Sequence, residues 1–370
     1  QAGKQPAIAY CYPDHVASYL RSKKVIDLNT YIHSADPTVA LTQAQIDDFI
    51  DGYYAEGTQF GDETKMYSLP FSKSTEVLYY NKTFFDENEL TVPTTWDQME
   101  ELCAKIKKID PNSVPLGYDS EANWFITMTE QLKTPYTSAG TDHYLWDTAE
   151  NKAFITRFTE WYTKGYLTTQ KLYGGYTSGL FVNQEADKDG KIIRSYMSIG
   201  SSAGAVHQAP KEGEIFEVGI APIPQIDAEN NPKVISQGPS LCLFDQKDDA
   251  VEAAAWQFVK FLLTSADFQA EFSMASGYVP VLESVLENSA YQTFLADANG
   301  YDEGIAAYSA KVCMDQKDYY YTSPAFVGSS TARDQVGQLL IACLAEKENL
   351  PGKIDKLFAD SIQTCKTLNP

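Results

Sequence analysis

Apolar and polar positions recur along this chain with two different periods, which together predict alternating strands and helices. Short apolar runs bounded by turn residues are typical of strands, and they occur at 8–10, 66–81, 192–200 and 216–223. Apolar residues spaced three and four apart predict helices over 96–109, 124–132, 149–164, 248–264 and 332–349. Alternation of the two element types favours an α/β fold with a parallel sheet.

Turn and capping residues mark where several of these elements begin. Asp36 and Pro37 form a turn, and Thr42 is placed to cap a helix that runs through Phe49. Pro93 cannot continue regular structure, so the next helix is expected to begin at Thr94 or Thr95.

Size and composition are those of a globular protein large enough for two domains. The chain has 370 residues, of which 44% are apolar and 21% charged. Its formal net charge of −21 opposes binding to nucleic acid or to anionic lipid. The same charge would weaken capture of an anionic ligand that lacks a local basic site.

Aromatic residues are unusually abundant, with 24 Tyr, 18 Phe and 5 Trp making up 13% of the chain. Tyrosine offers both a stacking face and a hydroxyl group. Two interpretations stay open: a tyrosine-rich core and surface, or a ligand site lined with aromatic platforms.

Cysteine and histidine residues give little sign of a metal or redox site. The cysteines at 11, 103, 242, 313, 343 and 365 form no CxxC pair, and the histidines at 15, 33, 143 and 207 are isolated. We therefore expect no metal and no cofactor, and interpret the cysteines as small buried apolar residues. A disulfide stays open.

Membrane and secretion signals are not apparent in the residues given. No apolar run approaches the ~20 residues that a membrane span needs. The first ten residues, QAGKQPAIAY, lack the basic start and apolar core of a secretion signal.

Seven loops share a common character, with small or hydroxyl residues next to an aromatic one, directly after a strand or before a helix. Such loops gather at the carboxyl ends of strands in open α/β sheets, where ligands bind. Their hydroxyl, amide and carboxylate groups suit sugar hydroxyls, and their rings suit sugar C–H faces, although turns favour the same residues without any ligand. The loops are 11–15, 71–75, 117–124, 199–204, 236–240, 276–280 and 323–330.

An ordered set of motifs resembles the extracellular solute-binding proteins of carbohydrate-uptake ABC transporters. The set comprises YSLPFSKSTEVLYYN from Tyr67, PTTWDQMEEL from Pro93, VGIAPIPQ from Val218, AAWQFVKFLL from Ala254 and MASGYVPV from Met274. The resemblance implies a type II periplasmic-binding-protein fold, with two α/β domains that close on a ligand by hinge bending.

Domain boundaries follow from the same resemblance. It implies that residues 1–73 with 240–288 form one domain, and that 74–239 with 289–370 form the other. The family has a strand, a helix and a second strand before the segment that matches PAIAYCYPDH. We therefore expect the chain to be part of a longer protein, with these strands and a signal peptide preceding residue 1.

Loop pattern brings the chain nearest to the glycerol-3-phosphate-binding branch of the family. By resemblance, six residues are expected to bind the ligand: Tyr12, Ser74, Trp124, Ser201, Gly238 and Tyr278. The branch carries an Arg near the position of Phe326, and Phe326 suits a sugar ring better than a phosphate. Arg194 and Arg333 are the arginines near candidate loops, while Asp14 and Asp119 would accept bonds from sugar hydroxyls and repel phosphate.

The predicted function is that of the substrate-binding component of an ABC importer, which carries a sugar from the interdomain cleft to a permease. The resemblance implies an extracellular bacterial lipoprotein that acts as a monomer. A glycerol-3-phosphate or glycerophosphodiester ligand is the alternative. A glycoside-active enzyme is a remoter one, because GxSxG, HExxH and phosphate-binding loop motifs are absent. A cell-surface adhesin is a third class.

Overall fold

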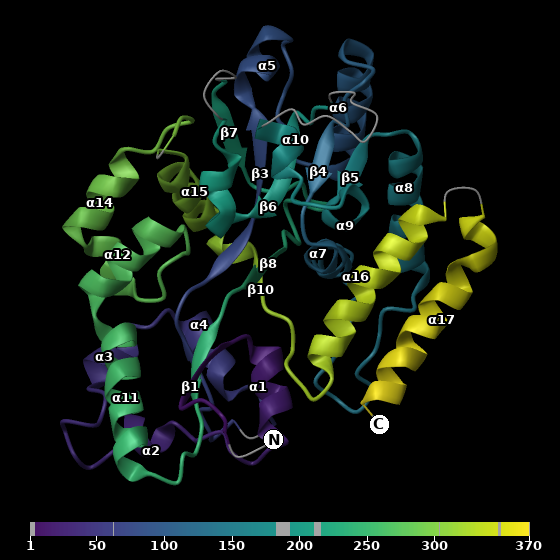
Figure 1. Cartoon of the computed structure of the whole chain (residues 1–370). Coiled ribbons are helices and arrows are strands. Elements are labelled where there is room, and N and C mark those ends of the chain that lie inside the picture. The colour runs from purple at the N-terminus through teal and green to yellow at the C-terminus, as the bar shows by residue number, and fades with distance from the viewer. Residues whose placement is uncertain are drawn as a thin grey trace. The chain divides into compact units, whose positions relative to one another are not determined.

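The computed structural model describes residues 4–61, 63–182, 193–210, 216–302, 304–346 and 349–369 (Figure 1). Its residues divide into two compact units. Unit 1 comprises residues 1–74, 237–296 and 324–330, and unit 2 comprises 75–236, 297–323 and 331–370. Unit 1 thus includes residues 74, 237–239, 289–296 and 324–330, which the resemblance assigns to the second domain.

Unit 1 contains a small antiparallel sheet and a set of helices. The sheet has the order β1 (Ile8–Cys11), β9 (Ser240–Leu243), β2 (Leu69–Pro70). The helices are α1 (Pro13–Leu20), α2 (Asn29–Ile32), α3 (Gln43–Asp47), α4 (Asp51–Ala55), α11 (Asp249–Thr264), α12 (Ala266–Ser276), α13 (Glu283–Glu287) and α14 (Ser289–Ala296). The predicted strand over 66–81 is thus divided between β2 in this unit and a second strand that enters unit 2.

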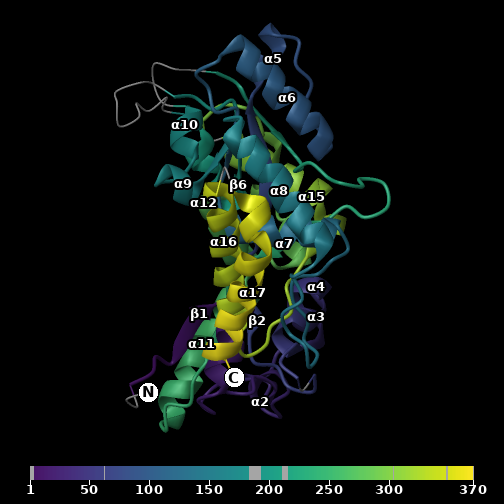
Figure 2. The ribbon, with the colours of Figure 1, turned by 90° about the vertical axis from the view of Figure 1, so that its right-hand side faces the viewer.

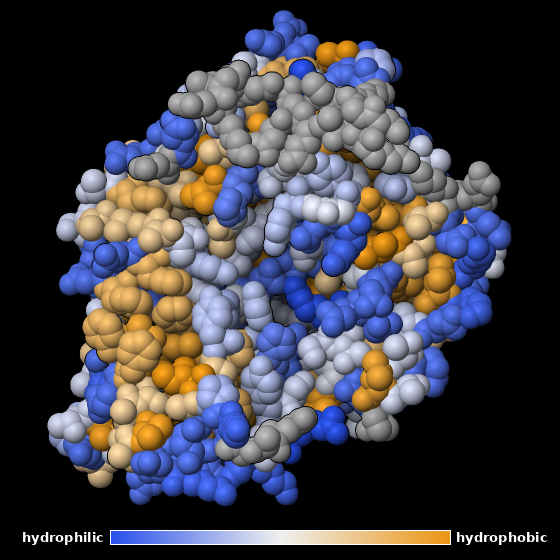
Figure 3. All heavy atoms as spheres, in the orientation of Figure 1, coloured by the Kyte–Doolittle hydropathy of each residue, from blue (hydrophilic) through white to orange (hydrophobic). Residues whose placement is uncertain are grey.

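Helix α11 is held to unit 1 through one buried tryptophan. Trp256 stacks on Tyr31 with ring centroids 5.2 Å apart, and its Nε1 donates to the carbonyl oxygen of Val39 over 2.8 Å. The opposite side of α11 is apolar and exposed at Val251, Phe258 and Phe261. Figure 3 shows an apolar surface region where Figure 1 places α11 and α12.

Unit 2 is built on a mixed sheet with the order β10 (Tyr320–Tyr321), β8 (Val234–Gln237), β3 (Ser74–Asn81), β6 (Met197–Ser201), β4 (Leu116–Tyr118), β5 (Leu167–Thr169). A further strand, β7 (Val218–Ala221), pairs with β3. Strands β4, β5 and β6 are mutually parallel, whereas β3 runs antiparallel to β6. The predicted α/β fold is therefore confirmed. Helices lie around a sheet that is parallel only in part.

Aromatic side chains form the core of unit 2 between the sheet and three helices. The helices are α6 (Trp96–Ile109), α7 (Glu121–Gln131) and α8 (Ala149–Thr163). Trp96, Trp124, Phe158 and Trp161 from these helices contact one another or Tyr118 of β4, and all five side chains are buried.

Unit 2 has further helices outside this core. They are α5 (Lys82–Glu87), α9 (Gln170–Tyr173), α10 (Ser178–Val182), α15 (Gly304–Asp315), α16 (Ser329–Ala345) and α17 (Leu350–Leu368). Figures 1 and 2 both show α16 and α17 lying side by side. Trp146 donates from Nε1 to Ser361 of α17 over 2.9 Å, and Lys152 of α8 pairs with Asp355 over 2.7 Å, so α17 is fixed at two points.

Candidate functional site

One edge of the unit 2 sheet gathers the carboxyl ends of β4, β5 and β6. Tyr118 of β4 lies opposite Ile199 of β6, and Ser201 at the end of β6 lies opposite Glu76 of the antiparallel strand β3. Asp119 directly follows β4. Carboxyl ends of parallel strands are the usual place for ligands in open α/β sheets. We therefore take this edge, with Asp119 and Ser201, as the candidate site of unit 2.

Asp119 is held at this edge by two backbone hydrogen bonds. Its amide donates to the carbonyl oxygen of Ile199, and its Oδ1 accepts from the amide of Thr177, each over 2.9 Å. Burial, assisted by the nearby Glu121 carboxylate, raises the pKa of Asp119. Its side chain is thus held in one position and is only partly hydrated. Its carboxylate oxygens can accept hydrogen bonds from ligand hydroxyls.

Ser201 ends β6 and begins the turn into the 3-10 helix 202–208. Its Oγ accepts from the amide of Ala203 over 3.3 Å, and its carbonyl oxygen accepts from the Tyr79 hydroxyl over 3.2 Å. Because the residue is partly exposed, its hydroxyl hydrogen can still be offered to a ligand.

Helix α7 also begins at this edge, where a serine side chain caps one amide of its first turn. Ser120 adopts a left-handed conformation with φ of 64°, and its Oγ accepts from the amide of Asn123 over 3.4 Å. The neighbouring Glu121 is buried and accepts from the amide of Lys171 over 2.7 Å. Two carboxylates, Asp119 and Glu121, thus flank the helix start, which disfavours an anionic ligand there.

Glu76 is a buried carboxyl group at the same edge. Its Oε2 accepts from the Tyr118 hydroxyl over 2.8 Å, and its carbonyl oxygen accepts from Gln316 over 2.9 Å. Burial raises the pKa of Glu76 to about 8, although Tyr118, Asn123 and Arg333 favour the charged form. The group is therefore largely protonated, and neutral, near neutral pH.

The buried Glu76 predicts a stability that falls as pH rises. A folded-state pKa above the unfolded value means that the stabilising contribution is complete below about pH 4.5 and is lost as pH passes through about 8. We expect the free energy of unfolding to drop by about 2–4 kcal/mol between about pH 5 and pH 9, measured by urea denaturation. Glu76→Gln should remove most of this drop. Glu101→Gln, on the exposed side of α6, should leave it intact, and an unchanged slope in Glu76→Gln would contradict the assignment.

Unit 1 gathers a second group of the predicted residues at one edge of its sheet. Cys11 and Pro70 both lie opposite Ser240, so the carboxyl ends of β1 and β2 share an edge with the amino end of β9. Tyr12 and Asp14 follow β1, and Gly238 precedes β9. Asp14 lies in the first turn of α1, where its Oδ1 accepts from the amide of His15 over 2.9 Å.

Gly238 and Ser74 are packed tightly where the chain passes between the units. Gly238 has φ of 144°, and a Cβ there would lie 2.2 Å from the carbonyl oxygen of Ser72. Only glycine fits this conformation and this close approach. Ser74 is buried, and its hydroxyl donates to the carbonyl oxygen of Gln237 over 3.5 Å. For both residues the structure shows a packing role.

Tyr278 is part of an aromatic cluster in unit 1. It stacks on Phe272 with centroids 6.3 Å apart, and Phe272 contacts Phe71, which meets Tyr10 edge-on at 5.8 Å. Burial and the neighbouring Tyr10 hydroxyl raise the pKa of Tyr278 to about 12. Tyr10 is 52% exposed and its hydroxyl lies 3.1 Å from Ser72 Oγ, so it is an additional candidate. Its outward position follows from strand alternation with the buried Cys11.

Two predicted stacking residues are buried. Trp124 is fully buried, stacked on Tyr118 at 4.7 Å and edge-on to Phe158 at 4.5 Å. In this structure the Trp124 ring is covered by core residues, which does not favour its expected contact with a ligand. Phe326 is 8% exposed, and its amide donates to Ser329 Oγ over 3.3 Å. Little of its ring is available for stacking.

The two arginines near candidate loops differ in position. Arg194 precedes β6 and therefore lies at the amino end of the strand whose carboxyl end carries Ser201. Arg333, in α16, donates to the side-chain oxygen of Asn123 in the first turn of α7. Arg333 is thus the arginine that lies near the candidate edge of unit 2.

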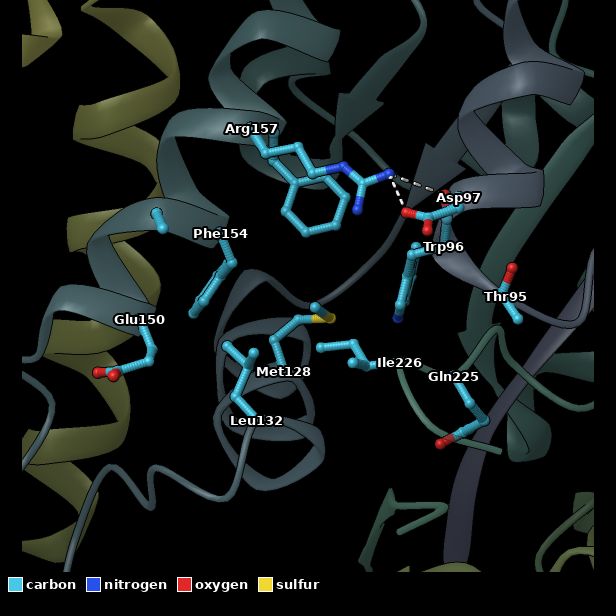
Figure 4. A pocket seen from close by; sticks show the side chains of 12 residues that line it. Thr95, Trp96, Asp97, Met128, Leu132, Glu150, Phe154, Arg157, Gln225 and Ile226 are labelled. Atoms are coloured by element: carbon cyan, nitrogen blue, oxygen red, sulfur yellow. Dashed lines mark hydrogen bonds and ion pairs between the residues drawn. The ribbon is translucent and has the colours of Figure 1, made fainter. Parts of the chain in front are cut away.

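Unit 2 also contains a pocket of about 530 Å³ that none of the predicted residues lines. Figure 4 shows Met128, Leu132, Phe154 and Ile226 around its hollow, with Arg157 directed toward Asp97. Arg157 pairs with Asp97 over 2.7 Å and with Glu100 over 3.0 Å. Its lining combines apolar side chains with polar ones, among them Thr95, Glu150 and Gln225, and its arginine is already paired with two carboxylates.

Neither a cluster of metal-ligating side chains nor a membrane-spanning helix occurs among the described residues. In the described ranges, no three His, Cys, Asp or Glu side chains come together as a metal site would require. None of the described helices has the length and apolar character of a membrane span.

Comparison with known proteins gives a family match over most of the chain. The sequence model of the family described as bacterial extracellular solute-binding protein matches residues 1–298. The sn-glycerol-3-phosphate-binding periplasmic protein UgpB of Yersinia pestis bv. Antiqua is 27% identical over 317 residues, which cover 82% of this chain and 67% of that protein.

Solved structures resemble the whole chain in fold. UgpB from Mycobacterium tuberculosis in complex with glycerophosphocholine has a TM-score of 0.75 at 17% identity, covering 98% of this chain and 83% of that one. An ABC substrate-binding protein from Listeria monocytogenes in complex with cycloalternan has a TM-score of 0.77 at 14% identity, covering 99% and 85%. These likenesses confirm the predicted type II periplasmic-binding-protein fold.

Proposed function

Because the chain belongs to the bacterial extracellular solute-binding protein family, we propose that it captures a neutral sugar or short oligosaccharide for an ABC importer. The observation that carries the choice of a neutral ligand is the pair of carboxylates, Asp119 and Glu121, around the start of α7. Hydroxyl groups of a sugar donate to carboxylates, whereas a phosphate at the same place would be repelled.

In unit 2 we assign hydrogen bonding to Asp119 and Ser201, because both lie at the carboxyl ends of parallel strands. In unit 1 we assign ring stacking to Tyr278, with Tyr12 and Tyr10 as further aromatic contacts. Asp14 would accept ligand hydroxyls, since it is partly exposed in the first turn of α1. Ser74 and Gly238 support the site by packing. Trp124 and Phe326 are left out of direct contact because they are buried.

A phosphate ester is the second candidate ligand. The curated relative from Yersinia is named for glycerol-3-phosphate, and the Mycobacterium tuberculosis structure contains glycerophosphocholine. In this chain Arg333, close to the first turn of α7, is the residue that favours such a ligand. Arginine binds phosphate oxygens with two parallel hydrogen bonds, so one well-placed arginine is an adequate partner.

Calorimetry on the purified chain separates the two candidates. A thermal-shift screen of mono- and oligosaccharides selects the best sugar, because a ligand that binds only the folded state raises the melting temperature. We expect heat of binding with that sugar and none with glycerol-3-phosphate. Asp119→Asn and Ser201→Ala should each weaken sugar binding by about tenfold or more, or ~1.4 kcal/mol.

Asp110→Asn is the matched control, because the Asp110 carboxylate accepts from the Tyr196 hydroxyl and from the amide of Asn112, each over 3.1 Å, and precedes β4 at its amino end. It should leave affinity unchanged. Tight binding of glycerol-3-phosphate without a response to any sugar would overturn the neutral-ligand proposal. In that case Arg333→Gln should abolish the binding.

The family and its relatives are binding proteins associated with transport, and we propose that this chain has no catalytic role. Incubation with oligosaccharides followed by product analysis tests this.

We further propose that units 1 and 2 are its two ligand-binding domains, that it acts as a monomer with ABC permease subunits, and that it is anchored outside the cell as a lipoprotein.

A further inference from the structure

Two cysteine thiols are in contact within the sheet of unit 1. Cys11 ends β1, and Cys242 lies in the adjacent strand β9. Cys11 is opposite Ser240 and Cys242 is opposite Ala9, so the two cysteines are diagonal neighbours on one face of an antiparallel pair. Their sulfur atoms are 3.5 Å apart, and Cys11 Sγ lies 3.7 Å from the carbonyl oxygen of Ser240.

An apolar cluster of unit 1 encloses this pair of thiols. Both cysteines are buried with Val16 and Phe244 in one apolar cluster of unit 1. The other cysteines of the chain, at 103, 313, 343 and 365, are also buried, and no thiol–thiol contact is found for them among the described residues. Cys11 and Cys242 are therefore distinguished by position rather than by burial.

We propose that Cys11 and Cys242 form a disulfide bond that links β1 to β9 when the protein folds in an oxidising extracellular medium. The sulfur atoms need to approach from 3.5 Å to the bond length of ~2.05 Å, and because the two cysteines are diagonal rather than directly opposite, the two strands have to shift as the bond forms. Extracellular proteins keep such bonds, whereas cytosolic ones do not. The proposal rests on the family's location outside the cell and not on the identity of the ligand.

The bond forms by thiol–disulfide exchange with a small-molecule disulfide as the oxidant. One cysteine thiolate attacks the oxidant, which gives a mixed disulfide and releases one small-molecule thiol. The second cysteine then attacks the protein sulfur of that mixed disulfide and releases the second thiol. Two electrons pass to the oxidant, and the two cysteine protons end on the released thiols.

Exchange has to take place while unit 1 is still folding. In the folded state Cys11 is 1% exposed and Cys242 is fully buried. The hydrogen bond with Cys242 and burial both raise the pKa of the Cys11 thiol, so the reactive thiolate is scarce once the strands have paired. A bond formed during folding is protected from reductant for the same reason.

The cross-link would also fix a part of unit 1 that carries assigned ligand residues. Tyr12 directly follows Cys11, and Gly238 precedes the strand that carries Cys242. A covalent tie between β1 and β9 therefore holds these two positions in register.

The test compares the 370-residue chain refolded with glutathione disulfide and the same chain refolded with a reductant. After oxidative refolding, alkylation in denaturant should modify four cysteines, the six of the chain less the two in the bond. Proteolysis and mass spectrometry should identify one linked peptide pair, containing Cys11 and Cys242. The urea midpoint of the oxidised protein should exceed that of the reduced protein.

Cys242→Ala should remove the redox dependence of the midpoint, and Cys103→Ala, at an equally buried position in α6, should retain it. Six alkylated cysteines after oxidative refolding of the unmodified chain, or a linked pair that involves other cysteines, would overturn the proposal. The thiol count uses the unmodified chain, so the test holds even if a variant fails to fold.

Discussion

Replacing Lys73 by Met is expected to reduce the free energy of unfolding by about 3–5 kcal/mol, because the substitution leaves a carboxylate buried without its partner. Lys73 is fully buried and pairs with Glu56, which is 5% exposed. Its Nζ also donates to the carbonyl oxygen of Gly238 over 3.3 Å and lies 5.6 Å from the centre of the Tyr53 ring. Urea denaturation of the variant measures the loss.

Two control variants distinguish the loss of this buried ion pair from the loss of a lysine charge in general. Lys24→Met removes the half-exposed Lys24–Asp245 pair of the same unit and should cost less than about 1 kcal/mol. The double variant Lys73→Met with Glu56→Leu should regain much of the loss, since an apolar pair of similar size often replaces a buried ion pair. A Lys73→Met loss no larger than that of Lys24→Met would show that the pair does not stabilise unit 1.

Helix positions were predictable from the sequence wherever capping and periodicity agreed. The helix predicted over 96–109 is α6, whose Thr95 side chain accepts from the amide of Gln98 as an N-cap. Helix α17 was missed, although Ile354, Phe358 and Cys365 recur with helical spacing on its buried side. The many polar residues between them hid that pattern.

The place of Asp119 and Ser201 at one edge of the sheet was predictable from strand order, whereas their contact with a ligand stays a prediction. Asp119 directly follows β4 and Ser201 ends β6, and parallel strands end at a common edge. The Lys73–Glu56 pair was not foreseen, because residues that far apart in sequence and of opposite charge are usually exposed. Nor does sequence reveal that α7 is buried on nearly all sides, which depends on α6, α8 and the sheet packing around it.

Trp124→Ala is expected to act on stability rather than on ligand binding. The fully buried ring packs against Tyr118 and Phe158, so its removal opens a cavity in the core of unit 2. We expect a loss of about 3–5 kcal/mol in the free energy of unfolding by urea denaturation. Trp124→Phe should recover part of that loss, because it refills part of the cavity.

The matched variant Tyr278→Ala should give the opposite result, because Tyr278 is half-buried in the aromatic cluster of unit 1. Its sugar affinity, measured by calorimetry, should fall by about 2 kcal/mol or more, with a smaller change in stability. Trp124→Ala, studied at a temperature where it is folded, should bind the sugar as the unmodified chain does. Suppose instead that Trp124→Ala kept the free energy of unfolding of the unmodified chain but lost its sugar affinity. Trp124 would then contact the ligand, and α7 would have to be less buried than this structure shows.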